Sequence, residues 1–282
     1  MYVIEKMNFK LYFITFYCLL FTVFLRAQCY TKITAFGNSE KLSYHVSYNL
    51  GFLWFNAGEV YFKTDSVTKN NREVIHFESV GTTYPDYDWI FKVRDKYQSY
   101  VDKETYKPLL FERTVNEGNT YTYNKYVFDY KRKKISFTYE NKKIARYSDT
   151  INYTDCSFDP ISLLYYCRNI DFSKVKENEK IPLTMYIDTV KYEVYIRYVG
   201  KETITTRSDE TYNCIKFRPM LVDGSIFKGG EEITVWVTDD ENKIPIYVEA
   251  KIMVGAIKVY LFEAKGLIHP LNSLIENDLK KP

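Results

Sequence analysis

The aspartates around residue 90 are the side chains in this sequence that come closest to a catalytic arrangement. Asp86 and Asp88 flank Tyr87 in a segment rich in aromatic residues, and Asp95 follows shortly after. Two carboxyl groups about 5 Å apart can cleave a glycosidic bond with retention of configuration. Spacing along the chain does not fix a distance in space, so a carbohydrate-active enzyme is the last of three functional hypotheses.

The other reactive residue types form no recognisable motif. The histidines are His45, His76 and His269, and their spacing fits no metal-binding pattern. No serine lies in a Gly-x-Ser-x-Gly elbow, and no cysteine has the sequence context of a thiol protease nucleophile. We therefore predict no catalytic residue, no metal site and no cofactor, and we expect a protein that is not an enzyme.

Aromatic residues supply the candidate binding site. Concave sheets lined by aromatic rings bind apolar or sugar ligands. Strand formation and core packing account for aromatic residues too, so both interpretations stay open. The predicted ligand is a lipid, a glycan or another amphiphilic small molecule. The candidate ligand-binding residues are Trp54, Tyr84, Tyr87, Trp89, Phe91 and Trp236.

Three short patterns indicate covalent modification. Asp65-Ser66-Val67, Asp149-Thr150-Ile151 and Asp188-Thr189-Val190 resemble the Asp-Ser/Thr-aliphatic acceptor used for O-glycosylation of exported Bacteroidetes proteins. A three-residue pattern also recurs by chance. The hypothesis makes Ser66, Thr150 and Thr189 the candidate acceptors.

The elements that would position these residues are mostly strands. Alternation is strongest from Ile233 to Gly266, where apolar and polar residues follow a two-residue period, and Asp239–Lys243 reads as a hairpin turn. Three successive antiparallel strands are predicted there. Further strands are predicted at residues 41–50, 52–66, 74–83, 96–101, 109–115, 120–130, 134–140, 143–153, 181–188, 191–199, 202–206 and 213–221.

Helical periodicity is convincing in one place. Asp159 is suited to cap a helix, Pro160 suits its first position, and Asn169 suits its end. Many Tyr (28) and Phe (19) with few Gly (11) and Pro (8) favour a strand-rich chain. The predicted fold is all-β: a large curved antiparallel meander, either an open barrel or two packed sheets, with one central helix near residues 159–170.

The N-terminus reads as a targeting segment. Lys6 and Lys10 precede the apolar run Leu11–Leu25, and Ala27 suits a cleavage site before Gln28. The run is short for a membrane span, which needs roughly 20 residues. We expect residues 1–27 to be a cleaved signal peptide and the mature protein to be periplasmic, with no transmembrane span. Residues 28–282 would then form a single β-rich domain, with strand-rich halves at about 41–153 and 181–266 joined by the helix.

The cysteine content allows disulfide bonds, and the net charge gives no support for a nucleic-acid partner. Cys29, Cys156, Cys167 and Cys214 follow the expected cleavage site, and four cysteines allow three disulfide pairings, although buried free thiols are the simpler interpretation. The net charge is +3, of which Lys6, Lys10 and Arg26 less Glu5 contribute +2. The remaining charge of about +1 gives no electrostatic case for a nucleic-acid partner.

Three segments together resemble a known family. They are FKVRDKYQSYVD (Phe91–Asp102), DPISLLYYCR (Asp159–Arg168) and VWVTDDENKIPIYVEAKIMVGAIKVYL (Val235–Leu261). The chain resembles the exported bacterial family known as domain of unknown function 3108, over roughly residues 42–266. The resemblance implies export, a curved antiparallel β architecture and a Bacteroidetes type of cell envelope. It implies no activity and no catalytic residues.

These observations lead to three hypotheses from different classes. The first is a non-enzymatic periplasmic binding or carrier protein for an apolar or amphiphilic envelope molecule, held in a curved sheet with the helix on its concave side. The second is a structural or assembly partner of envelope proteins, which would use an exposed strand edge or an aromatic patch. The third is the carbohydrate-active enzyme with Asp86, Asp88 or Asp95.

Overall fold

The computed structural model describes residues 33–50, 53–69, 71–223, 229–252 and 255–275, so the expected signal peptide lies outside the described residues. Within these ranges the chain forms sixteen strands, all in one sheet. They are β1 (Lys41–Leu50), β2 (Leu53–Lys69), β3 (Arg72–Thr83), β4 (Arg94–Asp102), β5 (Pro108–Glu117), β6 (Thr120–Asp129), β7 (Lys134–Asn141), β8 (Tyr147–Asn152), β9 (Ser157–Phe158), β10 (Lys180–Ile187), β11 (Val190–Thr205), β12 (Thr211–Pro219), β13 (Ile233–Thr238), β14 (Pro245–Lys251), β15 (Ala256–Lys265) and β16 (Leu274–Ile275).

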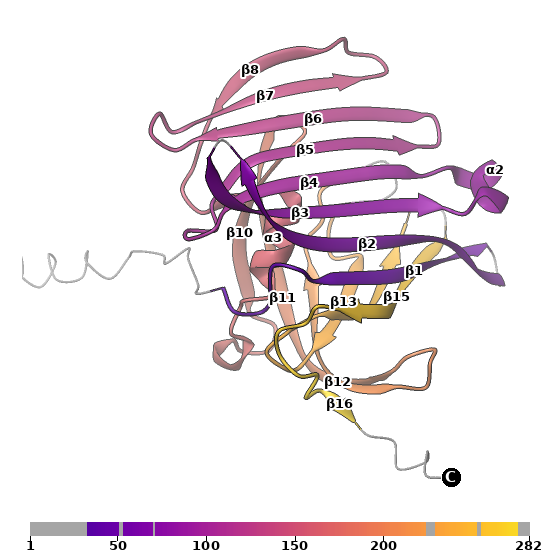
Figure 1. The fold of residues 1–282 in the computed structure, drawn as a ribbon. Coiled ribbons are helices and arrows are strands. Elements are labelled where there is room, and N and C mark those ends of the chain that lie inside the picture. Colours follow the sequence, from indigo (N-terminus) through magenta and orange to yellow (C-terminus); the bar gives the residue numbers. More distant parts are fainter. Residues whose placement is uncertain (1–32, 51–52, 70, 224–228, 253–254, 276–282) are drawn as a thin grey trace, which may run out of the picture. The chain divides into compact units, whose positions relative to one another are not determined.

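The sheet consists of two meanders joined edge to edge (Figure 1). From β1 to β8 each strand pairs antiparallel with the next, and the same holds from β10 to β15. The meanders meet where β1 pairs with β15, from Lys41 opposite Lys265 to Asn49 opposite Ala256. β9 adds a short parallel pair to β10, and β16 pairs with β12. The predicted all-β antiparallel meander is thus confirmed, as one open sheet.

The predicted helix is confirmed as α3 (Pro160–Cys167). The Asp159 carboxylate accepts the backbone N–H groups of Ile161 and Ser162 at 3.0 Å each, and the Ser162 hydroxyl accepts the Asp159 N–H at 3.1 Å. This reciprocal capping box satisfies donors that a helix start leaves free. Sequence reasoning missed three shorter helices: η1 (Pro85–Tyr87), α2 (Asp88–Phe91) and η2 (Phe172–Lys174).

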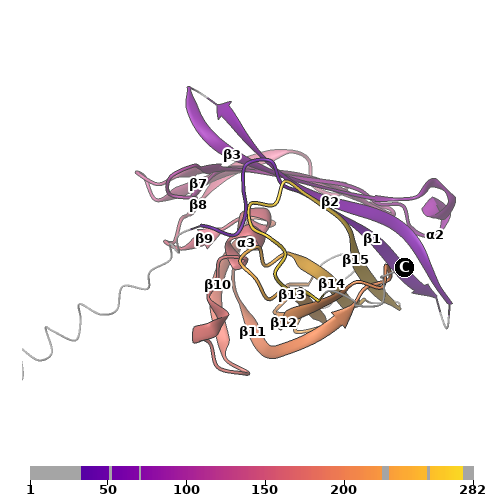
Figure 2. The same ribbon diagram turned by 60° about the horizontal axis from the view of Figure 1, so that its bottom comes forward.

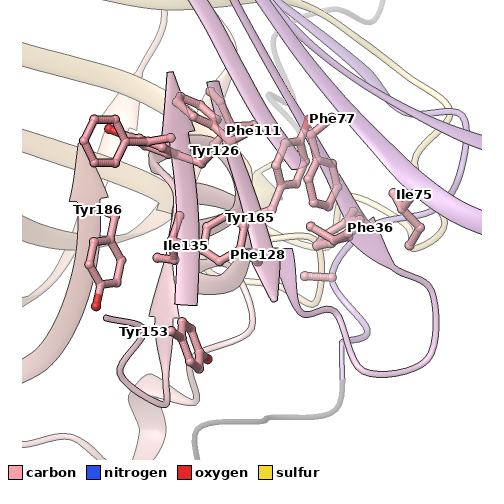
Figure 3. Close-up of a cluster of buried hydrophobic side chains, with 14 residues drawn as sticks. Phe36, Ile75, Phe77, Phe111, Tyr126, Phe128, Ile135, Tyr153, Tyr165 and Tyr186 are labelled. Carbon is pink, nitrogen blue, oxygen red and sulfur yellow. The ribbon is translucent and has the colours of Figure 1, made fainter. Parts of the chain in front are cut away.

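The largest apolar core lies between α3 and the inner face of the first meander (Figure 3). The ring of Tyr165 stacks on Phe77 of β3 with centroids 4.1 Å apart, and Phe36 meets Tyr165 edge to face at 4.9 Å. Fully buried members of this core come from the first meander and from α3, and they include Ile75, Phe77, Val101, Phe111, Tyr126, Ile135 and Tyr165.

The second meander bends back towards the first across this core. Tyr186 of β10 belongs to the same cluster, and its hydroxyl donates to the Asn152 carbonyl at 2.8 Å. The Thr189 N–H in the β10–β11 turn donates to the Tyr126 hydroxyl at 3.0 Å. Figure 2 shows α3 enclosed between the first meander and β10. The sheet is therefore curved, with the helix on its concave side.

Glycines allow two irregularities in the long strands. The pairing of β1 with β2 shifts between Val46 and Ser47, next to Gly58, which is opposite Val46. A Cβ on Gly58 would lie 2.1 Å from the Thr82 carbonyl oxygen, so no larger residue fits at this bulge. The prediction of two strands at 191–199 and 202–206 was wrong. Gly200 has a φ of 133° and absorbs a second bulge, which lets β11 continue through it as one strand of 16 residues.

A buried ion pair connects three parts of the fold. Arg168, at the end of α3, donates to both carboxylate oxygens of Glu40 at 2.5 and 2.8 Å. It also donates to the carbonyl of Ala35 at 3.0 Å and, from two nitrogens, to that of Asn242 at 2.9 and 3.1 Å. Glu40 is fully buried and Arg168 is 4% exposed. The pair holds the segment before β1, the helix and the β13–β14 turn together.

The first meander ends in an exposed edge strand, β8. Asp149 accepts the N–H of its neighbour Thr150 at 2.7 Å, so one backbone donor on this strand is taken by its own chain. No helix in the described part of the chain has the length and apolar character needed to cross a membrane.

Candidate binding site

Five of the six aromatic candidates gather at one end of the sheet. Trp54 lies near the tip of the β1–β2 hairpin, and the other four lie in the β3–β4 connection with η1 and α2, at the same end (Figure 1). Trp89 is 81% exposed, Trp54 40% and Phe91 38%. Leu53, which sequence reasoning missed, adds a side chain that is 59% exposed. We call Leu53, Trp54, Phe55, Tyr84, Tyr87, Trp89 and Phe91 the aromatic end.

Tyr84 and Tyr87 hold the two connections against each other. The Tyr84 N–H donates to the carbonyl of Ala57 at 2.8 Å, and its hydroxyl donates to Glu59 at 2.5 Å. Burial and this hydrogen bond raise the pKa of Tyr84 to about 12, so the phenol stays protonated and keeps donating. The Tyr87 ring lies on Phe55 with centroids 4.9 Å apart. These two residues therefore position the exposed rings.

Asp88 has a structural role in the same connection. It accepts a hydrogen bond from the Thr83 hydroxyl at 2.6 Å, and Arg94 donates to both its oxygens at 3.0 and 2.7 Å. The hydrogen bond from Thr83 and the charge and hydrogen bond of Arg94 lower the pKa of Asp88. Asp86 is exposed on the adjacent turn. These contacts fix the loop and hold Asp88 as a carboxylate.

Asp95 is brought together with a residue that sequence reasoning missed. Asp95 on β4 and Glu117 on β5 are 9% and 8% exposed and share a hydrogen bond. Burial raises the pKa of both carboxyl groups. Burial and the neighbouring Asp95 together raise the pKa of Glu117 to about 7. The N–H of Asn116 also donates to Asp95 at 2.8 Å. The pair retains a shared proton near neutral pH.

Trp236 lies on β13, four strands from the hairpin that carries Trp54, and is 5% exposed. Its indole N–H donates to Glu202 at 2.9 Å, and its ring stacks on Tyr247 at 4.9 Å. Tyr247 stacks in turn on Tyr260 at 4.8 Å, and Tyr260 is opposite His45, whose ring nitrogen is 3.3 Å from the Tyr84 hydroxyl. A stripe of rings thus connects Trp236 to the aromatic end across β13, β14, β15 and β1.

Cations from the chain itself cover parts of this stripe. Lys216 lies over the Trp236 ring at 4.9 Å. Arg207, from the β11–β12 turn, lies over Tyr260 at 4.1 Å and donates to the Asn56 side chain at 2.7 Å. Lys258 likewise lies over the Trp54 ring at 4.7 Å, and Phe262, which stacks on His45, is 48% exposed. The stripe is therefore mostly packed, and the aromatic end carries the most exposed ring, that of Trp89.

The sequence signal that could have found the stripe is the two-residue alternation within each strand. It places Tyr247, Tyr260 and His45 on the same face of their paired strands.

The remaining reactive residues have structural partners. His76 stacks on Tyr100 at 4.5 Å, and His269 contacts the Thr34 carbonyl at 2.6 Å. Among the residues that the structure describes, no three His, Cys, Asp or Glu side chains come together as a metal site. Cys156 is disulfide-bonded, so the expectation of a buried free thiol was wrong for this residue. Cys167 and Cys214 are free, and burial raises the pKa of both thiols to about 12.

The candidate acceptors for O-glycosylation differ in accessibility. Ser66 on β2 and Thr150 on β8 are exposed. Thr189 is half-buried in the β10–β11 turn beside Asp188, which pairs with Arg113. A glycosyltransferase would therefore reach Ser66 and Thr150 more easily than Thr189.

Comparison with known proteins gives a family and a fold. A crystal structure described as a β-barrel-like protein of domain of unknown function DUF1849 from Brucella abortus is similar with a TM-score of 0.52. It is 8% identical, and the match covers 82% of this chain and 99% of that chain, so it speaks for the fold alone. No curated protein matches the sequence. The model of the family described as "Protein of unknown function (DUF3108)" matches residues 43–261.

Proposed function

The chain belongs to the DUF3108 family, and we propose that it is a non-enzymatic binding protein of the cell envelope that carries an apolar or amphiphilic molecule. The observation that supports this most is the aromatic end. Leu53, Trp54, Trp89 and Phe91 expose large apolar surfaces on two adjacent connections. Neighbouring exposed apolar side chains mark a surface that is covered in use.

The free energy available at the aromatic end is sufficient for reversible binding. Covering one such side chain contributes about 2 kcal/mol, and association costs several kcal/mol in lost freedom and side-chain ordering. Leu53 and Trp54 are consecutive on β2 and point to opposite faces, so at most three of the four side chains cover one ligand. Three side chains together leave a moderate net affinity, as expected of a carrier that must release its ligand. Tyr84 and Tyr87 hold the loops in place beforehand, which lowers the ordering cost.

The partners of the carboxylates favour a non-enzymatic role. Asp88 is engaged by Thr83 and Arg94, and Asp95 shares its hydrogen bond with Glu117 at contact distance. A retaining glycosidase places its two carboxyl groups about 5 Å apart on either side of the sugar bond. Carboxyl groups hydrogen-bonded to each other do not have that arrangement.

The disulfide at Cys156 supports an exported location. Disulfides persist in the periplasm and outside the cell and are rare in the reducing cytosol. The charged and apolar segment at residues 1–27 is consistent with this, as a cleaved signal peptide ending at Ala27. We therefore propose the periplasm as the site of function.

Tryptophan fluorescence tests the proposed function directly, because Trp54 and Trp89 are exposed and Trp236 is buried. Monomeric octyl glucoside, kept below its micelle-forming concentration, should shift the emission to shorter wavelength and saturate. Trp54→Ala and Trp89→Ala should each weaken binding several-fold, measured by calorimetry. Tyr147→Ala removes a ring that is 41% exposed on β8 and should leave binding unchanged. Equal weakening by all three variants would refute the proposal, and so would a wild type that binds neither octyl glucoside nor an octyl amphiphile with a charged head group.

A second candidate function, an assembly partner of envelope proteins, is favoured by the edge of β8. Tyr147 is 41% exposed there, and Ile144 beside it is 45% exposed. Another protein could add a strand along this edge. Ser148→Pro would block such pairing, and capture of an envelope protein that survives this substitution would count against the edge as its binding surface.

A further inference from the structure

A polar cluster interrupts the apolar inner face of the first meander. Tyr97 on β4, Arg113 on β5 and Asn124 on β6 are directly opposite one another. The Arg113 Nε donates to the Asn124 side-chain oxygen at 2.5 Å, and its Nη2 pairs with Asp188 from the β10–β11 turn. Arg113 is 7% exposed and Asn124 is fully buried. Buried polar groups of this kind destabilise a fold unless something satisfies them.

The Asp95–Glu117 pair continues this cluster towards the aromatic end. Asp95 lies on the strand of Tyr97, and Glu117 lies on the strand of Arg113, whose charge acts on both carboxyl groups. Gly118 follows Glu117, and a Cβ on it would lie 2.9 Å from the Phe91 ring. The polar cluster therefore begins directly behind one of the exposed rings.

One donor in the cluster is left over. The side-chain Nδ2 of Asn124 has no hydrogen-bond partner among the described residues, although the side-chain oxygen of the same amide is bonded to Arg113. Leaving a buried donor unsatisfied costs about 1–3 kcal/mol. A hydrogen-bond acceptor that belongs to a ligand would remove this cost.

The charges around the cluster define which ligand it suits. Three carboxyl groups, from Asp95, Glu117 and Asp188, surround one cation, Arg113. An anionic group would meet the carboxylates, while Arg113 is already engaged by Asp188 and Asn124. A cationic group such as an ammonium has no acceptor for the Asn124 N–H that is unpartnered among the described residues. An uncharged group with hydroxyls can accept from Asn124 and can both donate to and accept from the carboxyl pair, which holds a proton.

We propose that the polar cluster of Asp95, Glu117, Arg113 and Asn124 binds an uncharged, hydroxyl-bearing head group, such as a sugar or glycerol, of an amphiphile whose apolar part contacts Phe91 and the aromatic end. This inference rests on the proposed function, and it specifies the class of ligand.

Three amphiphiles that share an octyl chain but differ in head group separate the contribution of the head group to affinity from that of the chain. They are octyl glucoside, octyl sulfate and octyltrimethylammonium, each titrated as a monomer by calorimetry. Octyl glucoside should bind the wild type at least tenfold more tightly than the other two. Equal affinities would overturn this inference and leave the carrier function standing. Tighter binding of the sulfate or the ammonium compound would also overturn it. No binding of any probe would overturn both.

Two nearly isosteric variants test the residues themselves. Asn124→Asp keeps the acceptor for Arg113 but replaces the free donor, so it should weaken octyl glucoside binding tenfold or more. Glu112→Gln is the control, because Glu112 points to the other face of β5, where it accepts from Tyr123 at 2.6 Å. Circular dichroism establishes that each variant is folded. A folded Asn124→Asp variant with unchanged affinity would overturn the assignment.

Discussion

Arg168→Met should be among the most destabilising single substitutions in this protein. Arg168 is the cation bonded to both oxygens of the fully buried Glu40, and it also donates to two backbone carbonyl groups, those of Ala35 and Asn242. Removing one partner of a buried ion pair costs about 3–5 kcal/mol, and each orphaned carbonyl adds about 1 kcal/mol. The expected loss of about 5–7 kcal/mol is a large part of the 5–15 kcal/mol typical of a domain.

The assay is equilibrium unfolding in urea, monitored by circular dichroism. The free energies of unfolding of the variants are compared with that of the wild type using a shared m-value. Arg197→Met is the matched control, because Arg197 also forms a two-pronged pair, with Glu231, but the side chains are 28% and 21% exposed. That variant should lose about 1 kcal/mol or less. The double variant Glu40→Gln with Arg168→Met should be more stable than Arg168→Met alone, since it removes the stranded charge. Similar losses for Arg168→Met and Arg197→Met would refute the reasoning.

Four further outcomes are expected. Gly118→Ala should cost about 1–2 kcal/mol in urea unfolding and move Phe91, because Gly118 has a φ of 54° and its Cβ would meet that ring; an unchanged stability would contradict the geometry. The pKa of Glu117 is raised to about 7 in the folded protein, from about 4.5 in the unfolded chain. Its contribution to stability is therefore fully present below pH 4.5 and is lost as the pH rises through about 7. Glu117→Gln should flatten the pH dependence of the unfolding free energy and be more stable than the wild type at about pH 8. Denatured, unreduced mature protein should titrate two thiols, Cys167 and Cys214, which are unreactive when folded, whereas more than two thiols would contradict the disulfide at Cys156. Intact-mass analysis of protein from its own host should show glycan that Ser66→Ala or Thr150→Ala removes, and Thr189→Ala should leave that mass difference unchanged.

Local patterns predicted much of the fold because strands and helices obey short-range rules. The alternation at residues 41–50 gave the bounds of β1, and Asp159 with Pro160 gave the start of α3. The same rules failed at Gly200, because whether a glycine ends a strand or forms a bulge depends on its partner strand. They also missed η1 and α2, whose start at Pro85 resembles any loop.

The candidate site could be predicted only in part. Tyr84, Tyr87, Trp89 and Phe91 lie close together in the sequence, so they were expected to share one connection. The pairing of β1 with β2 as a hairpin places Trp54 at the same end of the sheet. The polar cluster could not be foreseen. Arg113 and Glu117 are charged, so a pattern of polar and apolar residues assigns them to solvent, whereas their burial depends on strands and turns far away in the sequence.

The join between β1 and β15 has a consequence for how this chain folds. Within each meander successive strands pair through short connections, so these hairpins can form quickly. The join instead pairs Lys41 with Lys265, and all the strands from β2 to β14 separate them in the sequence. A chain that crosses a membrane from its N-terminus would expose the edge of β1 until β15 emerged. During that interval the edge is open to pairing with other chains, so we expect the folding yield to fall as the protein concentration rises and to increase when chaperones are present.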